Sequence, residues 1–142
     1  MQWNQRSSCP GLDRAGVYVI AISRENISGT RFSWISEIVY VGMTNSRGGL
    51  GSRLAQFDRT IKGREEHGGA RRIRFKHPDH ASLLRHLYVA VRPFECDVSS
   101  KKPRDLRIMG DVEKQEYECL ALFAKKFKRL PEFNDKKRSP KE

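Results

Sequence analysis

The sequence predicts a small α/β (α+β) domain in which a central three-stranded antiparallel sheet is flanked by helices. Three observations support this fold class. Residues 17–22 and 38–42 are short runs of β-branched and aromatic side chains, residues 83–94 alternate in the manner of a third strand, and two other segments repeat apolar residues at helical spacing. With 142 residues, the chain fits one domain with a modest core.

One domain and two flanking segments account for the whole chain. Residues 1–15 contain Pro10 and Gly11 and show no apolar period, so we expect an irregular N-terminal arm. Residues 135–142 are almost entirely charged and are expected to form a disordered tail. Residues 16–134 between them form the predicted domain.

The first two strands are expected to pair with each other. Residues 17–22 and 38–42 are apolar on both faces, which predicts a sheet that is covered on both sides, or at least strands that are central and not at an edge. An antiparallel pair joined by the long connection 23–37 is the simplest arrangement. The third strand is expected at residues 83–94.

A helix is predicted directly after the second strand. Its apolar residues follow one another at steps of four, three and four, which places them on a single face. They are Leu50, Leu54, Phe57 and Ile61. Arg53 lies beside this stripe, and the basic segment 62–80 is expected to form a loop plus a short helix or turn.

The longest helix is expected after a polar loop at residues 96–110, with Asp111 as its N-cap and Pro131 at its end. Its inward stripe contains Val112, Glu116, Cys119, Leu120, Phe123, Phe127 and Leu130. A glutamate therefore occupies a face that is otherwise apolar, which makes Glu116 a candidate functional residue.

Composition limits the classes of partner and compartment. The 28 Lys and Arg residues against 17 Asp and Glu give a net charge of +11, which favours a polyanionic partner such as nucleic acid. The three cysteines form no Cys-x-x-Cys pair, which favours a reducing compartment. No apolar run approaches the roughly 20 residues of a membrane span. We therefore expect a soluble, intracellular (cytoplasmic) protein that does not enter a membrane.

Two glycine-bearing triplets lie on the predicted strand pair, Gly16-Val17-Tyr18 and Tyr40-Val41-Gly42. They resemble the paired signature of the GIY-YIG nucleases. The order of later features is similar as well: a helix with Arg53, a strand, a helix with a glutamate, then Pro131 and Asn134. The resemblance covers about residues 16–134.

This resemblance implies a metal-dependent endonuclease that hydrolyses DNA phosphodiester bonds by direct attack of an activated water. It implies that Tyr18 accepts a proton from that water. A tyrosine with its ordinary pKa near 10 is a poor base at neutral pH, so it needs help, which Tyr40, a lysine or Arg47 could supply. Arg53 would bind phosphate oxygens, and Glu116 would hold one Mg²⁺ or Mn²⁺ ion. These four residues are the predicted catalytic set.

The chain departs from the family pattern in two places, and one assignment has alternatives. Phe57 occupies a position where many members carry a histidine or tyrosine, so proton transfer from that position must be absent or moved. The connection 23–37 is longer than in the shortest members and could contact substrate. Glu113 and Glu118 lie close to Glu116, and Glu118 is the alternative metal ligand.

Substrate binding is expected from basic loop residues that grip phosphates without reading sequence. Candidate residues are Arg47, Arg64, Arg71, Arg72, Arg74, Lys76, Lys101, Lys102 and Arg104. The preferred substrate-binding set is Arg47, His67, Arg71, Arg72 and Asn134, of which Asn134 is also expected to fix local backbone. Trp3 and Trp34 could stack on an exposed base.

Two interpretations compete with the nuclease. The first is an inactive binding module that kept the fold and lost the chemistry, which Phe57 favours. The second is a basic accessory subunit that needs a partner. A homodimer would let one site per chain cut two strands, although no residue pattern indicates it.

Overall fold

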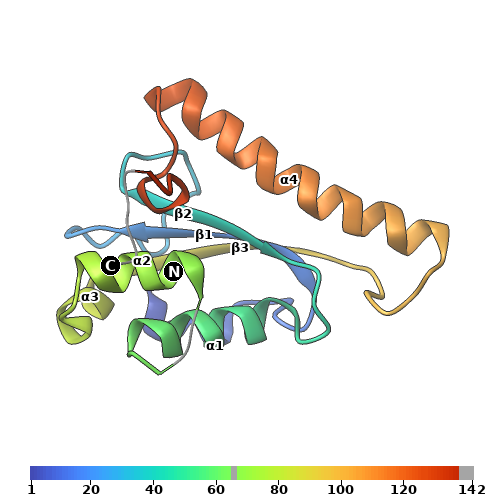
Figure 1. Cartoon of the computed structure of the whole chain (residues 1–142), viewed down its shortest axis with the longest axis horizontal. Coiled ribbons are helices and arrows are strands. Elements are labelled where there is room, and N and C mark those ends of the chain that lie inside the picture. Colours follow the sequence, from blue (N-terminus) through green and yellow to red (C-terminus); the bar gives the residue numbers. More distant parts are fainter. Residues whose placement is uncertain (65–66, 138–142) are drawn as a thin grey trace.

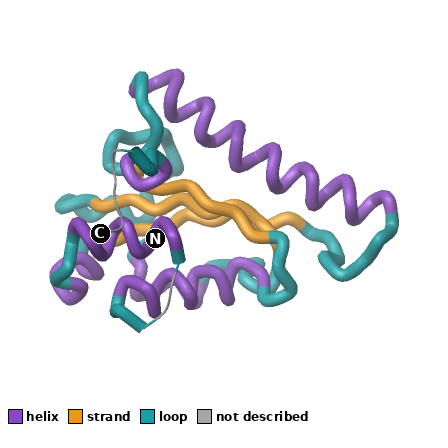
Figure 2. Tube along the Cα trace, viewed as in Figure 1, coloured by secondary structure: helices purple, strands orange, loops and turns teal. Residues whose placement is uncertain are grey.

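The structure, a computed structural model, describes residues 1–64 and 67–137. Its three strands form the middle layer between helices (Figure 1, Figure 2). They are β1 (Ala15–Ile22), β2 (Ile38–Thr44) and β3 (Leu87–Phe94), antiparallel in the order β2-β1-β3. The predicted fold class, a three-stranded antiparallel sheet flanked by helices, is confirmed.

One face of the sheet packs against the helices that follow β2. They are α1 (Gly49–Ile61), α2 (Gly68–Lys76) and α3 (His80–Arg85). The α1 residues predicted to share a face are all buried, and they surround Tyr18 and Ile20 of β1. The predicted apolar stripe of this helix is therefore confirmed, and α2 corresponds to the short helix expected within residues 62–80.

The other face of the sheet is covered by α4 (Pro103–Phe127), which crosses it obliquely (Figure 1). Val112, Cys119 and Phe123 of this helix are buried against the β1 side chains that point away from α1. Cover on both faces, which the apolar character of the strands predicted, is confirmed.

Element boundaries differ from the predictions at three points. Helix α4 begins at Pro103 and not after Asp111, because proline at the first helical position loses no hydrogen bond. It ends at Phe127, where Lys128 adopts the left-handed conformation with φ 59°. Strand β3 begins only at Leu87, because residues 80–85 form α3.

The N-terminal segment is part of the core, so the prediction of an irregular arm is wrong. It contains a 3-10 helix, η1 (Trp3–Ser8), and Trp3 is completely buried. The Trp3 indole Nε1–H donates to Asp58 Oδ1 at 2.9 Å. The backbones of Met1 and Val89 exchange hydrogen bonds at the outer edge of β3. Trp3 is therefore not available to stack on a base.

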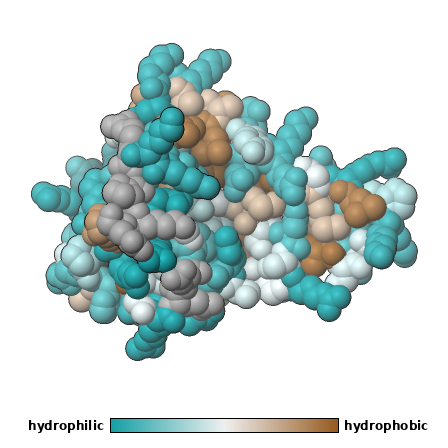
Figure 3. Space-filling model, in the orientation of Figure 1, coloured by the Kyte–Doolittle hydropathy of each residue, from teal (hydrophilic) through white to brown (hydrophobic). Residues whose placement is uncertain are grey.

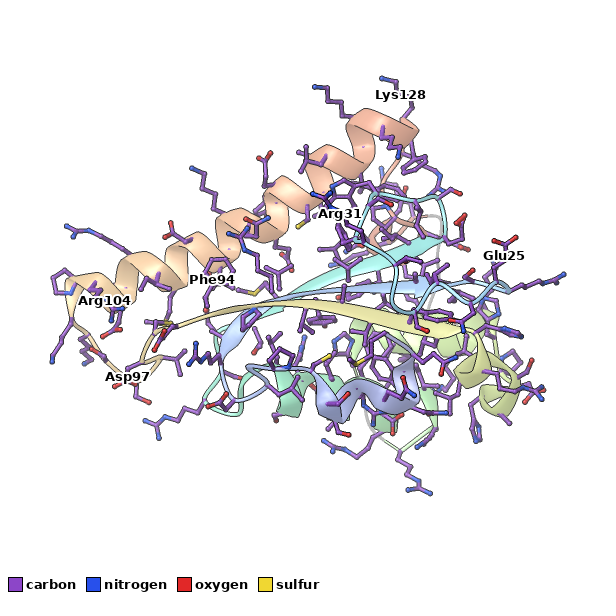
Figure 4. The ribbon with its side chains drawn as sticks, turned by 180° about the vertical axis from the view of Figure 1, so that it is seen from behind. Glu25, Arg31, Phe94, Asp97, Arg104 and Lys128 are labelled. Carbon is purple, nitrogen blue, oxygen red and sulfur yellow. The ribbon has the colours of Figure 1, made fainter. Side chains whose placement is uncertain are left out.

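The connection 23–37 lies on the α4 side of the sheet, as the view from behind shows around Arg31 (Figure 4). Lys126 Nζ donates to the Trp34 carbonyl at 2.5 Å, and Arg129 Nη2 reaches the Ser36 carbonyl at 3.4 Å. This places the connection on the side of the sheet that α4 covers, opposite to the Tyr18 side chain.

The surface seen in Figure 3 is mostly hydrophilic, with a few separate apolar patches. No helix among the described residues combines the length and apolar character needed to cross a membrane. Of the predicted disordered tail, residues 138–142 lie outside the described residues.

Candidate active site

Two tyrosines from neighbouring strands share one face of the sheet. In the β1–β2 register Tyr18 lies opposite Gly42, and Tyr40 lies opposite Ile20. The two rings are therefore diagonal neighbours, with their centroids 6.1 Å apart. Tyr18 is completely buried, whereas Tyr40 is half-buried and is the tyrosine with access to solvent.

Two glycines leave room for these rings. A Cβ atom at Gly42 would lie 2.4 Å from both Cζ and the hydroxyl oxygen of Tyr18. A Cβ atom at Gly69, in the first turn of α2, would lie 2.4 Å from Cε1 of Tyr40. Close approach of an aromatic ring, and not backbone conformation, therefore requires glycine at both positions.

His67 is the buried partner of Tyr18 and the N-cap residue of α2. Its Nε2 lies 2.8 Å from the Tyr18 hydroxyl oxygen, and its Nδ1 accepts the Ala70 N–H at 3.2 Å. Burial, followed by the charge of Arg53, lowers the pKa of His67 to about 4. The ring is 3% exposed and both of its nitrogens have partners, which does not favour the predicted contact between His67 and substrate.

Helix α1 supplies a permanent cation to this region. Arg53 Nη1 donates to Gln56 Oε1 at 2.7 Å. The Arg53 Nε–H is buried and has no hydrogen-bond partner within the described part of the chain. The charge of Arg53 lowers the pKa values of Tyr18, Tyr40 and Glu116, so the guanidinium lies within electrostatic reach of all three.

Helix α4 supplies a carboxylate from the opposite layer. Glu116 is half-buried, and this burial raises its pKa. The charge of Glu116 in turn raises the pKa values of Tyr18 and Tyr40, although burial is the largest cause for both tyrosines. Four groups from β1, β2, α1 and α4 therefore influence one another.

The neighbouring glutamates are placed differently. Glu113 and Glu118 are both exposed. Glu113 acts on Glu116 by raising its pKa, whereas Glu118 acts on the Cys119 thiol. Glu116 is therefore the glutamate whose charge reaches the tyrosines.

Protonation states follow from this burial. The pKa values of Tyr18 and Tyr40 both lie above the ordinary value near 10, so both phenols keep their protons at neutral pH. Together with Arg53 they provide O–H and N–H donors beside the carboxylate of Glu116. Such a set can bind an anionic ester and stabilise negative charge that develops on it.

Glu116 is the residue that could hold a divalent cation here. Within residues 1–64 and 67–137, no three His, Cys, Asp or Glu side chains gather as a metal site. Mg²⁺ takes few protein ligands and keeps several waters, so a single carboxylate suits it. A cation beside Glu116 would also offset the cost of its burial. The residues present therefore fit one hydrated divalent ion.

Two residues predicted to bind substrate hold the backbone instead. Arg72 is buried and donates from Nε and Nη2 to the Phe133 carbonyl at 3.0 and 2.8 Å, which does not favour its predicted phosphate contact. Asn134, in η2 (Glu132–Asn134), accepts the Val41 N–H and donates to the Val41 carbonyl, both at 2.9 Å. Its expected role in fixing local backbone is confirmed.

Arg47 and Arg71 remain candidates for phosphate contact. Arg47 lies exposed in the loop between β2 and α1, and Arg71 is half-buried on α2. Arg47 precedes Arg53 by six residues, and Arg71 follows His67 by four. Neither side chain is fully buried, in contrast to Arg72.

Phe57 belongs to the core, as its place in the α1 stripe predicted. It is completely buried, and its ring centroid lies 5.1 Å from that of His67. The contact between His67 and Tyr18 is the feature that sequence reasoning missed. The available signal was a histidine before Gly68 and Gly69, at a point where a helix could begin.

Comparison of the chain with protein-family models, with curated proteins and with solved structures gave no match in any of the three.

Proposed function

We propose that this chain is a GIY-YIG-type endonuclease that hydrolyses DNA phosphodiester bonds with the help of one divalent metal ion. The observation that carries the proposal is the convergence of Tyr18, Tyr40, Arg53 and Glu116 from four separate elements. These are the residues that the family resemblance implies, and their chemistry matches what phosphodiester hydrolysis requires.

Arg53 and Glu116 would have different electrostatic roles. The Arg53 guanidinium has a fixed charge and a buried Nε–H that finds no hydrogen-bond partner among residues 1–64 and 67–137, so it is suited to a phosphate oxygen. Glu116 would hold the metal ion, which when bound supplies positive charge beside the scissile phosphate. Without that ion, the neighbouring Arg53 offsets part of the cost of burying Glu116.

The two tyrosines differ in their exposure to solvent, so they would have different roles. The resemblance implies that Tyr18 accepts a proton from the attacking water, but Tyr18 is completely buried. Tyr40 is half-buried and lies beside it on the same face. We therefore assign contact with the attacking water to Tyr40. Tyr18 would pack beside Tyr40 and fix its position.

DNA is the proposed partner because of charge. The net charge of +11 favours a polyanion, and exposed Arg47 lies in the loop that leads into the helix bearing Arg53. Contacts of this kind bind the sugar-phosphate backbone and carry no sequence information. Binding should therefore weaken steeply as salt rises.

An inactive nucleic-acid-binding module is the second candidate, and two observations favour it. Phe57 replaces a polar residue of many family members and is sealed in the core. Burial also raises the pKa of Tyr18 well above its ordinary value, which opposes proton acceptance.

Cleavage of supercoiled plasmid in Mg²⁺, in Mn²⁺ and in chelator decides between the two. Glu116→Gln is the test variant, and Glu118→Gln is its matched control, because it removes the same charge from the same helix at an exposed position. Tyr40→Phe and Tyr18→Phe compare the two phenols.

The nuclease proposal expects metal-dependent nicking that Glu116→Gln abolishes and Glu118→Gln keeps. It also expects a larger loss for Tyr40→Phe than for Tyr18→Phe. Salt-sensitive DNA binding without cleavage in either metal would reject the nuclease in favour of the binding module.

A further inference from the structure

His67 is enclosed by the aromatic side chains of the candidate site. Its ring centroid lies 5.9 Å from that of Tyr40, 6.4 Å from that of Tyr18 and 5.1 Å from that of Phe57, with each pair edge-to-face. Since only 3% of the residue is exposed, water does not compete for its nitrogens. The hydrogen bonds of His67 therefore determine where its proton resides.

Those hydrogen bonds select one tautomer. The backbone N–H of Ala70 can only donate, so the Nδ1 atom that it contacts at 3.2 Å must present its lone pair. A neutral imidazole carries one proton, which must then be on Nε2. The Nε2–H consequently donates to the hydroxyl oxygen of Tyr18 at 2.8 Å.

The doubly protonated ring is unfavourable in this setting. A second proton on Nδ1 would face the Ala70 N–H and break the N-cap of α2. Burial and the nearby charges of Arg53 and Arg72 act in the same direction, since together they lower the pKa of His67 to about 4. His67 is therefore a neutral donor at neutral pH, and its lone pair is not available as a base.

This donor restricts the orientation of the Tyr18 hydroxyl. Once the oxygen accepts the His67 N–H, the Tyr18 hydrogen must point in another direction. Tyr40 lies on the same face, and hydrogen bonding from Tyr18 is one of the influences that lower the pKa of Tyr40. Tyr40 is therefore the neighbouring phenol toward which the Tyr18 hydrogen can be directed.

We propose that His67 is a positioning residue, a neutral Nε2–H donor that orients the Tyr18 hydroxyl so that its proton is directed toward Tyr40. The catalytic consequence rests on the proposed nuclease function, whereas the tautomer and the hydrogen bond are properties of the folded chain alone. This role replaces the substrate contact predicted from sequence, and it supplies from α2 a polar group that Phe57 does not provide.

Two variants at position 67 separate this role from helix capping. His67→Asn places an amide where Nδ1 was, so it keeps an acceptor for the cap and loses the donor to Tyr18. His67→Gln places an amide where Nε2 was, so it keeps a donor for Tyr18 and loses the cap. A purely structural role would make His67→Gln the more damaging change, whereas positioning of Tyr18 makes His67→Asn the more damaging one.

The first measurement is the tautomer, read from the ¹⁵N shifts of the imidazole nitrogens and assigned by the signal that disappears in His67→Asn. The expected result is a proton on Nε2 at pH 7. A proton on Nδ1, or a doubly protonated ring, would overturn the proposal even if the protein cut no DNA.

The second measurement is plasmid nicking in Mg²⁺. His67→Asn should lower kcat about tenfold, the value of one buried hydrogen bond, with KM unchanged, and His67→Gln should stay within about threefold of wild type. In a Tyr18→Phe background His67→Asn should cost nothing further. A larger loss for His67→Gln, or additive losses with Tyr18→Phe, would overturn the positioning role while the nuclease itself stood.

Discussion

Replacing Gly42 by alanine should disturb the Tyr18 ring directly. The added Cβ would lie 2.4 Å from Cζ and 2.8 Å from Cε1 of Tyr18, whereas ordinary Cβ contacts begin near 3.4 Å. The ring would have to move by about 1 Å, and its neighbours His67 and Phe57 are themselves buried. Overpacking of this kind costs about 1–3 kcal/mol.

Gly110→Ala is the matched control. Gly110 lies within α4, and no atom of the described residues outside the helix's own neighbouring backbone lies within 4 Å of a Cβ atom added there. Alanine is favoured over glycine inside a helix by roughly 0.5–1 kcal/mol, so this variant should gain stability. Urea unfolding followed by circular dichroism should therefore give midpoint shifts of opposite sign for the same chemical change.

A second substitution tests whether the ring itself is responsible. Tyr18→Phe removes the hydroxyl but keeps the ring carbons that the new Cβ meets, so Gly42→Ala/Tyr18→Phe should be no more stable than Gly42→Ala. Unfolding of Gly42→Ala at the wild-type urea midpoint would refute the packing argument. Rescue by Tyr18→Phe would show that only the hydroxyl was in the way.

Three further changes test other contacts. Asn134→Ala removes both hydrogen bonds to Val41 and should cost about 1–2 kcal/mol in the free energy of unfolding, measured by urea titration; an unchanged value would mean that water replaces the amide. Arg72→Met leaves the Phe133 carbonyl unsatisfied and should cost about 1–3 kcal/mol, with the salt dependence of DNA binding unchanged in a filter-binding assay. Because folding lowers the pKa of His67 to about 4, its contribution to stability is complete above the unfolded value near 6.5 and is lost as pH falls toward 4, by roughly 3 kcal/mol at most. His67→Asn should lack this part of the pH dependence, and equal slopes for the two proteins would contradict it.

The sheet and the first helix could be predicted because their signals are local. Residues 17–22 and 38–42 combine β-branched and aromatic side chains over a length too short for most helices, and both are strands. The α1 stripe repeats at helical spacing, and all of its members are buried. In each case a short stretch of chain contains the pattern of apolar residues that becomes buried in the folded protein.

Other elements could not be found in this way. The N-terminal segment lacks a period because a 3-10 helix of six residues is too short to show one, and Trp3 is buried by partners far along the chain, such as Asp58. Lys102, the N-cap residue of α4, makes no side-chain capping bond. Asp111 is the more conspicuous capping residue, so the sequence predicts a later start for α4 than the structure has.

The candidate site lies between these two cases. Each of its four residues lies on an element that the sequence predicts: Tyr18, Tyr40, Arg53 and Glu116. Neither periodicity nor propensity indicates that these residues come together. Only the family resemblance implies it. The same limit explains His67, whose role depends on a partner 49 residues away. A histidine beside two glycines in a basic segment is typical of an exposed loop, and only the packing of α2 against Tyr40 reverses that interpretation.

Gly42 shows why a short pattern can nevertheless identify such a site. In a strand, glycine is unfavourable unless a neighbour occupies the space of its missing side chain. Here the neighbour is the ring of Tyr18, which is fixed in turn by His67 on its hydroxyl side. A tyrosine on one strand and a glycine opposite it on the next are therefore coupled by a single packing requirement. That coupling makes the two triplets more informative together than either is alone, because β-propensity favours the tyrosine but disfavours the glycine.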